Sequence, residues 1–150
     1  MKLAEALIER KELQSKVARL KQRLLNNALV QEGSVPNEDP KVLITDLEKT
    51  LDRLRDVIDR INKTNVSVSV DGSTLSEMIN KRDLMITRIA IMREFLEKAS
   101  SRVDRYTRNE ILVLSTVDVE PYQKQLDKLS YEARMLDAKI QYTNWNTELI

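Results

Sequence analysis

Apolar residues recur at alternating steps of four and three in four segments of this chain, and this spacing constrains the fold more than any other feature. Side chains at this spacing return to one face of an α-helix. The pattern therefore predicts a mainly all-α fold. The four stripes are Leu13, Val17, Leu20 and Leu24; Leu47, Leu51, Leu54, Ile58 and Ile61; Leu75, Met78, Arg82, Met85, Ile89, Met92, Leu96 and Val103; and Tyr122, Leu126, Leu129, Ala133, Leu136 and Ile140.

The ends of the helices are marked by residues that start or stop them. We expect helices over residues 3–30, 40–63, 75–103 and 119–142, with Asp39 and Asp118 as N-caps. With only 2 glycines and 3 prolines in 150 residues, little else interrupts the pattern. The simplest assembly is a single domain, residues 1–150, folded as an antiparallel up-down-up-down four-helix bundle.

The period changes between the second and third helices. Val66, Val68 and Val70 alternate with polar residues, which is typical of a strand. Asp71-Gly72 follows and favours a tight turn. We therefore predict a small β-hairpin here.

The residue types that are absent exclude several kinds of chemistry. The chain has no histidine and no cysteine, so it lacks histidine acid–base catalysis, histidine-ligated zinc and disulfides. We expect no cofactor, no metal site and, on balance, no enzyme. A net charge of +1 argues against nucleic-acid binding, and no apolar run is long enough for a membrane span. Without an N-terminal signal-peptide pattern, we expect a cytoplasmic bacterial protein.

Arginines cluster after the third helix, where Arg102, Arg105 and Arg108 surround Tyr106. Arginine binds carboxylates and phosphates through two parallel hydrogen bonds, so the cluster is a candidate anion or acidic-partner site. The structural alternative is that these cations complement the dipole at a helix C-terminus.

A second candidate site joins the exit of the second helix to the end of the chain. Asn62 and Asn65 would form a polar pocket there with Asn144 and Trp145. In the structural alternative the asparagines cap helices and Trp145 plugs the end of the bundle.

Arg82, followed by Asp83, lies on the apolar stripe of the third helix. A buried arginine needs a partner, so Arg82 pairs with a carboxylate on a facing helix, faces a subunit interface or acts as a recognition arginine. The hairpin edge and the apolar segment Ile111–Leu114 further favour a homo-oligomer or a protein partner.

The order of several short motifs resembles a septicolysin-like family of small bacterial helical proteins. They include MKLAEAL at the start, RINKTN at Arg60–Asn65, DRYTRNEI at Asp104–Ile111 and NWNTEL at Asn144–Leu149. The family name implies a membrane-active cytolysin, but the resemblance brings no reaction that attaches to particular residues.

The function predicted from these features is self-association or partner binding without catalysis. The alternative is a small-molecule or anion-binding protein, or an enzyme, that uses a polar site at one end of the bundle. Membrane lysis is the third hypothesis.

Overall fold

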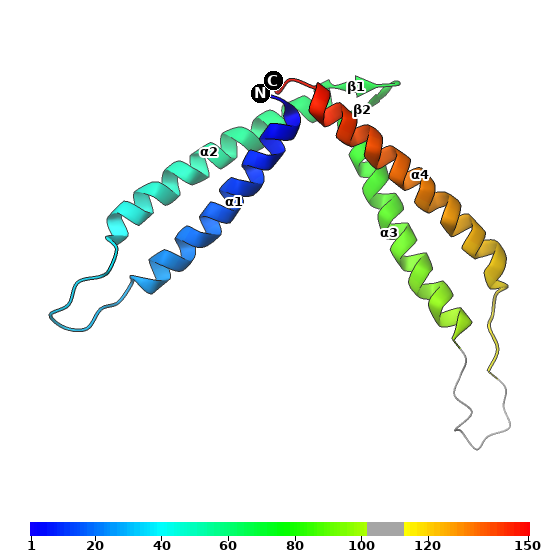
Figure 1. Ribbon diagram of the computed structural model, residues 1–150, viewed down its shortest axis with the longest axis horizontal. Coiled ribbons are helices and arrows are strands. Elements are labelled where there is room, and N and C mark those ends of the chain that lie inside the picture. Colours follow the sequence, from blue (N-terminus) through cyan, green and yellow to red (C-terminus); the bar gives the residue numbers. More distant parts are fainter. Residues whose placement is uncertain (102–112) are drawn as a thin grey trace, which may run out of the picture. The chain divides into compact units, whose positions relative to one another are not determined.

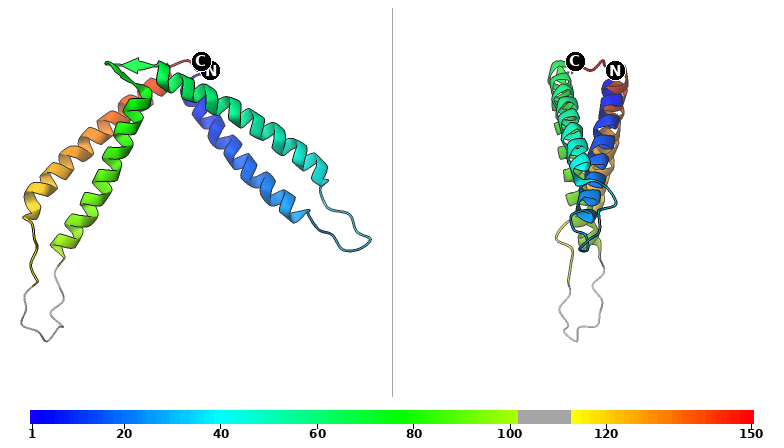
Figure 2. Two further views of the ribbon diagram at one scale, coloured as in Figure 1. Left: turned by 180° about the vertical axis from the view of Figure 1, so that it is seen from behind. Right: turned by 90° about the vertical axis from the view of Figure 1, so that its left-hand side faces the viewer.

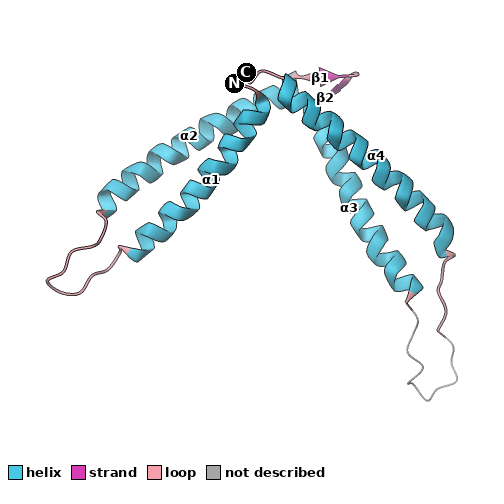
Figure 3. Ribbon diagram, in the orientation of Figure 1, coloured by secondary structure: helices cyan, strands magenta, loops and turns pink. Residues whose placement is uncertain are grey.

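The computed structural model describes residues 1–101 and 113–150, and in this part of the chain it is mainly helical (Figures 1 and 3). The predicted fold class is confirmed, including an antiparallel hairpin between the second and third helices. The elements are α1 (Leu3–Asn26), α2 (Pro40–Ser67), β1 (Ser69–Val70), β2 (Ser73–Thr74), α3 (Leu75–Ser100) and α4 (Val119–Asn146).

The chain divides into two compact units. Unit 1 contains residues 1–75 and 141–150, and unit 2 contains residues 76–140. Within them α1 runs beside α2 and α3 beside α4, as Figures 1 and 2 show. It remains a prediction that all four helices form one domain around one shared core.

In unit 1, four buried residues of α2 form a row with a spacing of seven, and Ile61, which is 1% exposed, is buried beside this row. The row consists of Leu43, Thr50, Val57 and Thr64, which are at most 3% exposed. The stripe predicted for this helix is offset from the row, because Leu51 is 45% exposed. Two of the four core positions are threonines, whose hydroxyls donate to the carbonyl oxygens four residues earlier, at 2.6 Å from Thr50 and 2.8 Å from Thr64. This internal pairing allows a polar side chain to lie in an apolar core.

The first helix ends four residues before the predicted limit of Val30. Asn27 is buried, and its side-chain nitrogen donates to the carbonyl oxygen of Arg23 at 2.8 Å. Its side-chain oxygen accepts from the backbone N–H of Glu38 at 3.0 Å, which ties the end of α1 to the start of α2. The N-cap predicted there is confirmed, because Asp39 accepts from the backbone N–H of Lys41 at 2.9 Å.

The second helix continues past its predicted end and shortens the hairpin. The backbone N–H of Val68 still donates to the carbonyl oxygen of Thr64 at 3.0 Å, so α2 includes Val66 and ends at Ser67. The predicted turn is confirmed, since Asp71 and Gly72 have φ values of 51° and 83°. Positive φ at both central residues gives the backbone twist that joins two antiparallel strands.

In unit 2, the stripes predicted for the third and fourth helices meet. Ile89 and Leu96 of α3 form a buried cluster with Leu126 and Ala133 of α4. Met85, Met92, Val119 and Leu129 pack against this cluster. The predicted end of the third helix at Val103 lies outside the described residues. The fourth begins at Val119, directly after Asp118 as predicted, but extends to Asn146 rather than Tyr142.

Two leucines of α1 test this account of the core. Leu20 is fully buried and Leu25 is 61% exposed. We expect Leu20→Ala to lower the free energy of unfolding by about 2–5 kcal/mol, and Leu25→Ala by less than about 1 kcal/mol. Urea denaturation followed by circular dichroism measures both. Equal losses for the two variants would show that this face of α1 is wrongly assigned.

Candidate functional site

The arginine cluster predicted after the third helix lies outside the described residues. The cluster consists of Arg102, Arg105, Tyr106 and Arg108, so the anion site remains a prediction. Of the neighbouring apolar segment, Val113 and Leu114 are described, and they are 66% and 76% exposed.

Arg82 has the carboxylate partner on a facing helix that its place on the stripe predicted. Its Nη1 donates to Asp137 of α4 at 2.7 Å, and its Nε and Nη2 donate to Asp83 at 2.9 Å. Burial lowers the pKa of the guanidinium, but the hydrogen bonds to Asp137 and Asp83 outweigh it, and the pKa lies above its usual range. The side chain is 20% exposed, so the arrangement joins the two helices of unit 2 and leaves little of Arg82 for a ligand.

The four residues of the second predicted site differ in exposure. Asn144 is 5% exposed, and its Oδ1 is buried without a hydrogen-bond partner among the described residues. Asn65 is half-buried, whereas Asn62 lies on the surface. Trp145 is in α4 and 54% exposed, so the interpretation of this residue as a plug is wrong.

The end of the chain binds the start of the chain beside these residues. Leu3 donates through its backbone N–H to the carbonyl oxygen of Thr147 at 2.9 Å, and Leu149 donates to that of Met1 at 2.9 Å. The backbone N–H of Ile150 donates to the Thr64 hydroxyl at 3.1 Å. The tail therefore connects α1 to α2, and Figure 1 shows the two termini together.

One edge of the α1/α2 pair carries an ion pair at every seventh residue of α1. The four residues are Lys2, Glu9, Lys16 and Arg23, and we call this edge the charged edge. Lys2 binds Glu148 at 2.6 Å, and the other three bind residues of α2 or the turn before it. These pairs are Glu9–Arg53 at 2.6 Å, Lys16–Asp46 at 2.7 Å and Arg23–Glu38.

The hydrogen bonds of this edge lower the pKa of three carboxyl groups below their ordinary range. Arg23 does so for Glu38, and Lys16 does so for Asp46. Lys2, with the N-terminal ammonium, lowers the pKa of Glu148. The charged edge is therefore most favourable when its carboxyl groups are ionised.

The opposite edge of α2 is apolar, and we define this apolar edge as Ile44, Leu51 and Ile58. Residues of the charged edge, such as Asp46 and Arg53, follow core residues by three positions, which is about 60° to one side. The apolar edge follows core residues by one position, about 100° to the other side. Ile44 and Leu51 are 46% and 45% exposed, so α1 leaves much of this edge uncovered.

The third helix also has an apolar face outside its core. Ile91 follows the core residue Ile89 by two positions, which places it about 160° around the helix from the core, and Leu84 lies seven residues before Ile91 on the same face. They are 69% and 60% exposed, and Phe95 beside them is 42% exposed. A helix that is apolar on two opposite faces is normally covered on both. The four-and-three spacing did not reveal this face, because we used it to identify only one apolar face of each helix.

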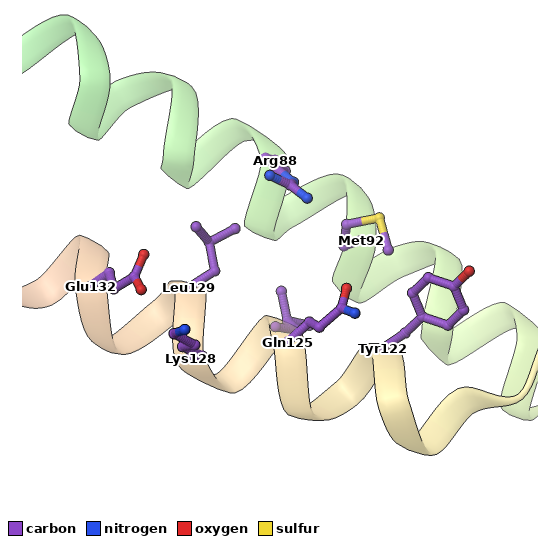
Figure 4. A pocket seen from close by; sticks show the side chains of 8 residues that line it. Arg88, Met92, Tyr122, Gln125, Lys128, Leu129 and Glu132 are labelled. Atoms are coloured by element: carbon purple, nitrogen blue, oxygen red, sulfur yellow. The ribbon is translucent and has the colours of Figure 1, made fainter.

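A cleft of about 260 Å³ lies between α3 and α4 in unit 2 (Figure 4). Arg88, Lys128, Gln125 and Glu132 are its polar side chains, and Met92 contributes apolar surface. In Figure 4 Arg88 comes from α3, whereas Gln125, Lys128 and Glu132 come from α4. Neither Arg88 nor Lys128 forms an ion pair with any described residue. Nothing in the spacing of the sequence singled out the four polar residues of this cleft.

Two further observations restrict the chemistry of the described part of the chain. It holds no group of three or more acidic, histidine or cysteine side chains arranged to bind a metal ion. None of its helices has the length and apolar character needed to cross a membrane.

Comparison with known proteins gives a family and a structural relative. The model of a family of unknown function (DUF6847) matches residues 10–149. The fold is similar to the crystal structure of a functionally unknown conserved protein from Corynebacterium diphtheriae, with 39% sequence identity and a TM-score of 0.94. The match covers 100% of this chain and 99% of that one. Among curated proteins, none matches the chain.

The role of Arg82 is tested by removing its two partners separately. We expect Asp137→Ala to lower the free energy of unfolding by about 1 kcal/mol, because a half-buried guanidinium loses its partner on the facing helix. Asp83→Ala, which leaves that contact intact, should cost less than about 0.5 kcal/mol. Chemical denaturation of both variants measures the difference. A larger loss for Asp83→Ala would contradict the assigned role of Asp137.

The charged edge predicts a loss of stability in acid. Carboxyl groups with a lowered pKa in the folded state stabilise the fold above the unfolded pKa of about 4, and this contribution is lost as pH falls through the folded pKa. We expect the melting temperature to be nearly constant from about pH 8 to pH 6 and to fall below about pH 4.5. Replacing Glu38, Asp46 and Glu148 by the corresponding amides should lower the plateau and flatten the fall. An unchanged acid dependence in that variant would mean that other carboxyl groups cause it.

Proposed function

The chain belongs to DUF6847, a family of unknown function, and from its geometry we propose that it is a non-enzymatic protein that acts by self-association through apolar helical faces. The observation that carries this proposal is the second apolar face of α3. Leu84, Ile91 and Phe95 lie outside the core of unit 2, and each is at least 42% exposed. Covering such side chains with another helix removes apolar surface from water, which is the main driving force of association.

Two features of the chain support binding over catalysis. It has no histidine or cysteine, the side chains most often used as acid–base catalysts or nucleophiles near neutral pH. In addition, the lowered carboxyl pKa values found in the described residues belong to ion pairs that join α1 to its neighbours. These perturbed groups thus have a structural explanation.

The proposal is tested by the mass of the protein in solution. Light scattering after size-exclusion chromatography, from about 5 to 200 μM, should show a mass that rises above that of one chain, 17.4 kDa. Leu84→Glu with Ile91→Glu should shift the protein towards the monomer. Ala90→Glu is the control, because it adds one glutamate at an exposed position on another side of α3.

A monomer at all concentrations would overturn the proposal. A monomer that is destabilised by the paired glutamates would indicate instead that α3 packs within its own chain.

A second candidate function is the binding of an anionic small molecule, and the cleft of Figure 4 favours it. Arg88 and Lys128 both line this cleft, and their positive charges favour the binding of an anion such as a phosphate or a carboxylate. A thermal-shift screen of phosphates and carboxylates should show stabilisation that is lost in Arg88→Ala. Trp145→Ala tests the candidate site at the end of the chain in the same screen. The resemblance to septicolysin-like proteins also stays a prediction, and dye release from phospholipid vesicles tests the activity it implies.

A further inference from the structure

We propose that α2 forms one contact between two copies of the chain, packing antiparallel against α2 of a second copy about a two-fold axis between Leu51 and Leu54. The proposal rests on the self-association proposed above and adds to the exposed face of α3 a second surface and its partner. The surface is the apolar edge together with the half-buried Leu47 and Leu54 beside it.

The apolar residues of α2 are spaced so that they match their own copy in the reversed direction. Taken along the helix, they alternate by four and three residues over Leu47, Leu51, Leu54 and Ile58. Reversing this series about its midpoint superposes it on itself. In an antiparallel pair each of these residues then faces an apolar residue of the other copy, in the layers Leu47 with Ile58 and Leu51 with Leu54.

The charges that flank the stripe are also complementary to their own copy. Glu48 and Arg55 both lie on the side of the stripe away from α1, seven residues apart, and their midpoint lies close to that of the apolar series. Antiparallel pairing brings Glu48 of each copy opposite Arg55 of the other, which gives two equivalent ion pairs. A parallel pair would place these flanks of the two copies on opposite sides of the seam, so neither ion pair could form.

The surroundings of both residues leave them available for this contact. The side chain of Arg55 is 74% exposed, and its ion pair is with Asp52 on the same helix at 3.2 Å. Glu48 is exposed and forms no ion pair within the described residues. The charged edge, in contrast, has its ionic groups paired within the chain. A second copy thus meets satisfied charges on one side of α2 and, on the other, a partly covered apolar stripe in which Ile44 and Leu51 are the exposed residues.

Charge reversal with rescue tests the pairing in the full-length protein. Glu48→Arg creates two arginine–arginine contacts across the axis, and Arg55→Glu creates two contacts between acids. Each should weaken the dimer about tenfold in sedimentation or dilution measurements. The double variant Glu48→Arg with Arg55→Glu should restore the affinity, because the pairs form again with their charges exchanged. Lys11→Glu is the control for a charge reversal at an exposed position of unit 1 outside this surface.

Disulfide cross-linking tests the direction of the two helices independently, because the chain contains no cysteine. A mixture of Glu48→Cys and Arg55→Cys chains, carrying tags of different mass, should form mixed disulfide dimers on oxidation. Neither variant alone should cross-link, since equivalent positions in an antiparallel pair lie about 10 Å apart along the axis, beyond disulfide reach.

The outcomes separate this proposal from the more general one. A monomeric wild-type chain would overturn both. An oligomer that ignores the α2 substitutions but dissociates with the paired glutamates at Leu84 and Ile91 would overturn the α2 contact and keep self-association. Cross-linking of each cysteine variant with itself would overturn the antiparallel direction.

Discussion

The register between α1 and α2 depends on the charged edge, and much of unit 1 follows from that register. Steps of seven residues bring α1 back to the same side of the helix, and each of Lys2, Glu9, Lys16 and Arg23 finds an opposite charge there. Shifting α1 by one residue would separate these pairs and rotate the apolar residues away from Val57. Exposed pairs contribute little stability singly, but Glu9 has the opposite sign to Lys2 and Lys16, so a shift of α1 by seven residues in either direction would place a lysine beside Arg53.

The fold class could be predicted from the sequence because the core of unit 2 follows the four-and-three spacing of apolar residues. Ile89, Leu96, Leu126 and Ala133 lie on the predicted stripes and are the residues that pack together. In α2 the same rule selected a stripe that is offset from the core, because Thr50 and Thr64 hold core positions. Their hydroxyls bond within their own helix, a pairing that the amino-acid type alone does not reveal.

The candidate site was predictable where one residue broke a clear pattern. Arg82 interrupts an apolar stripe, which made a carboxylate on a facing helix one of the expected partners, and Asp137 is that carboxylate. The prediction for Trp145 failed because it depended on where α4 ends. One further turn of helix carries that side chain to an exposed position, and helix ends are the least certain feature of a periodic pattern.

The two edges of the α1/α2 pair differ in a way that a simple helical hairpin does not need. A hairpin requires one apolar seam, and Leu43, Thr50, Val57 and Thr64 already supply it. Ile44 and Leu51 add apolar surface next to that seam, but much of their surface is not buried against α1. The charged edge would repel an apolar partner, because its ions would lose their water. A partner helix is therefore favoured on one side of α2 alone, and this asymmetry selects the surface that we propose for the second copy.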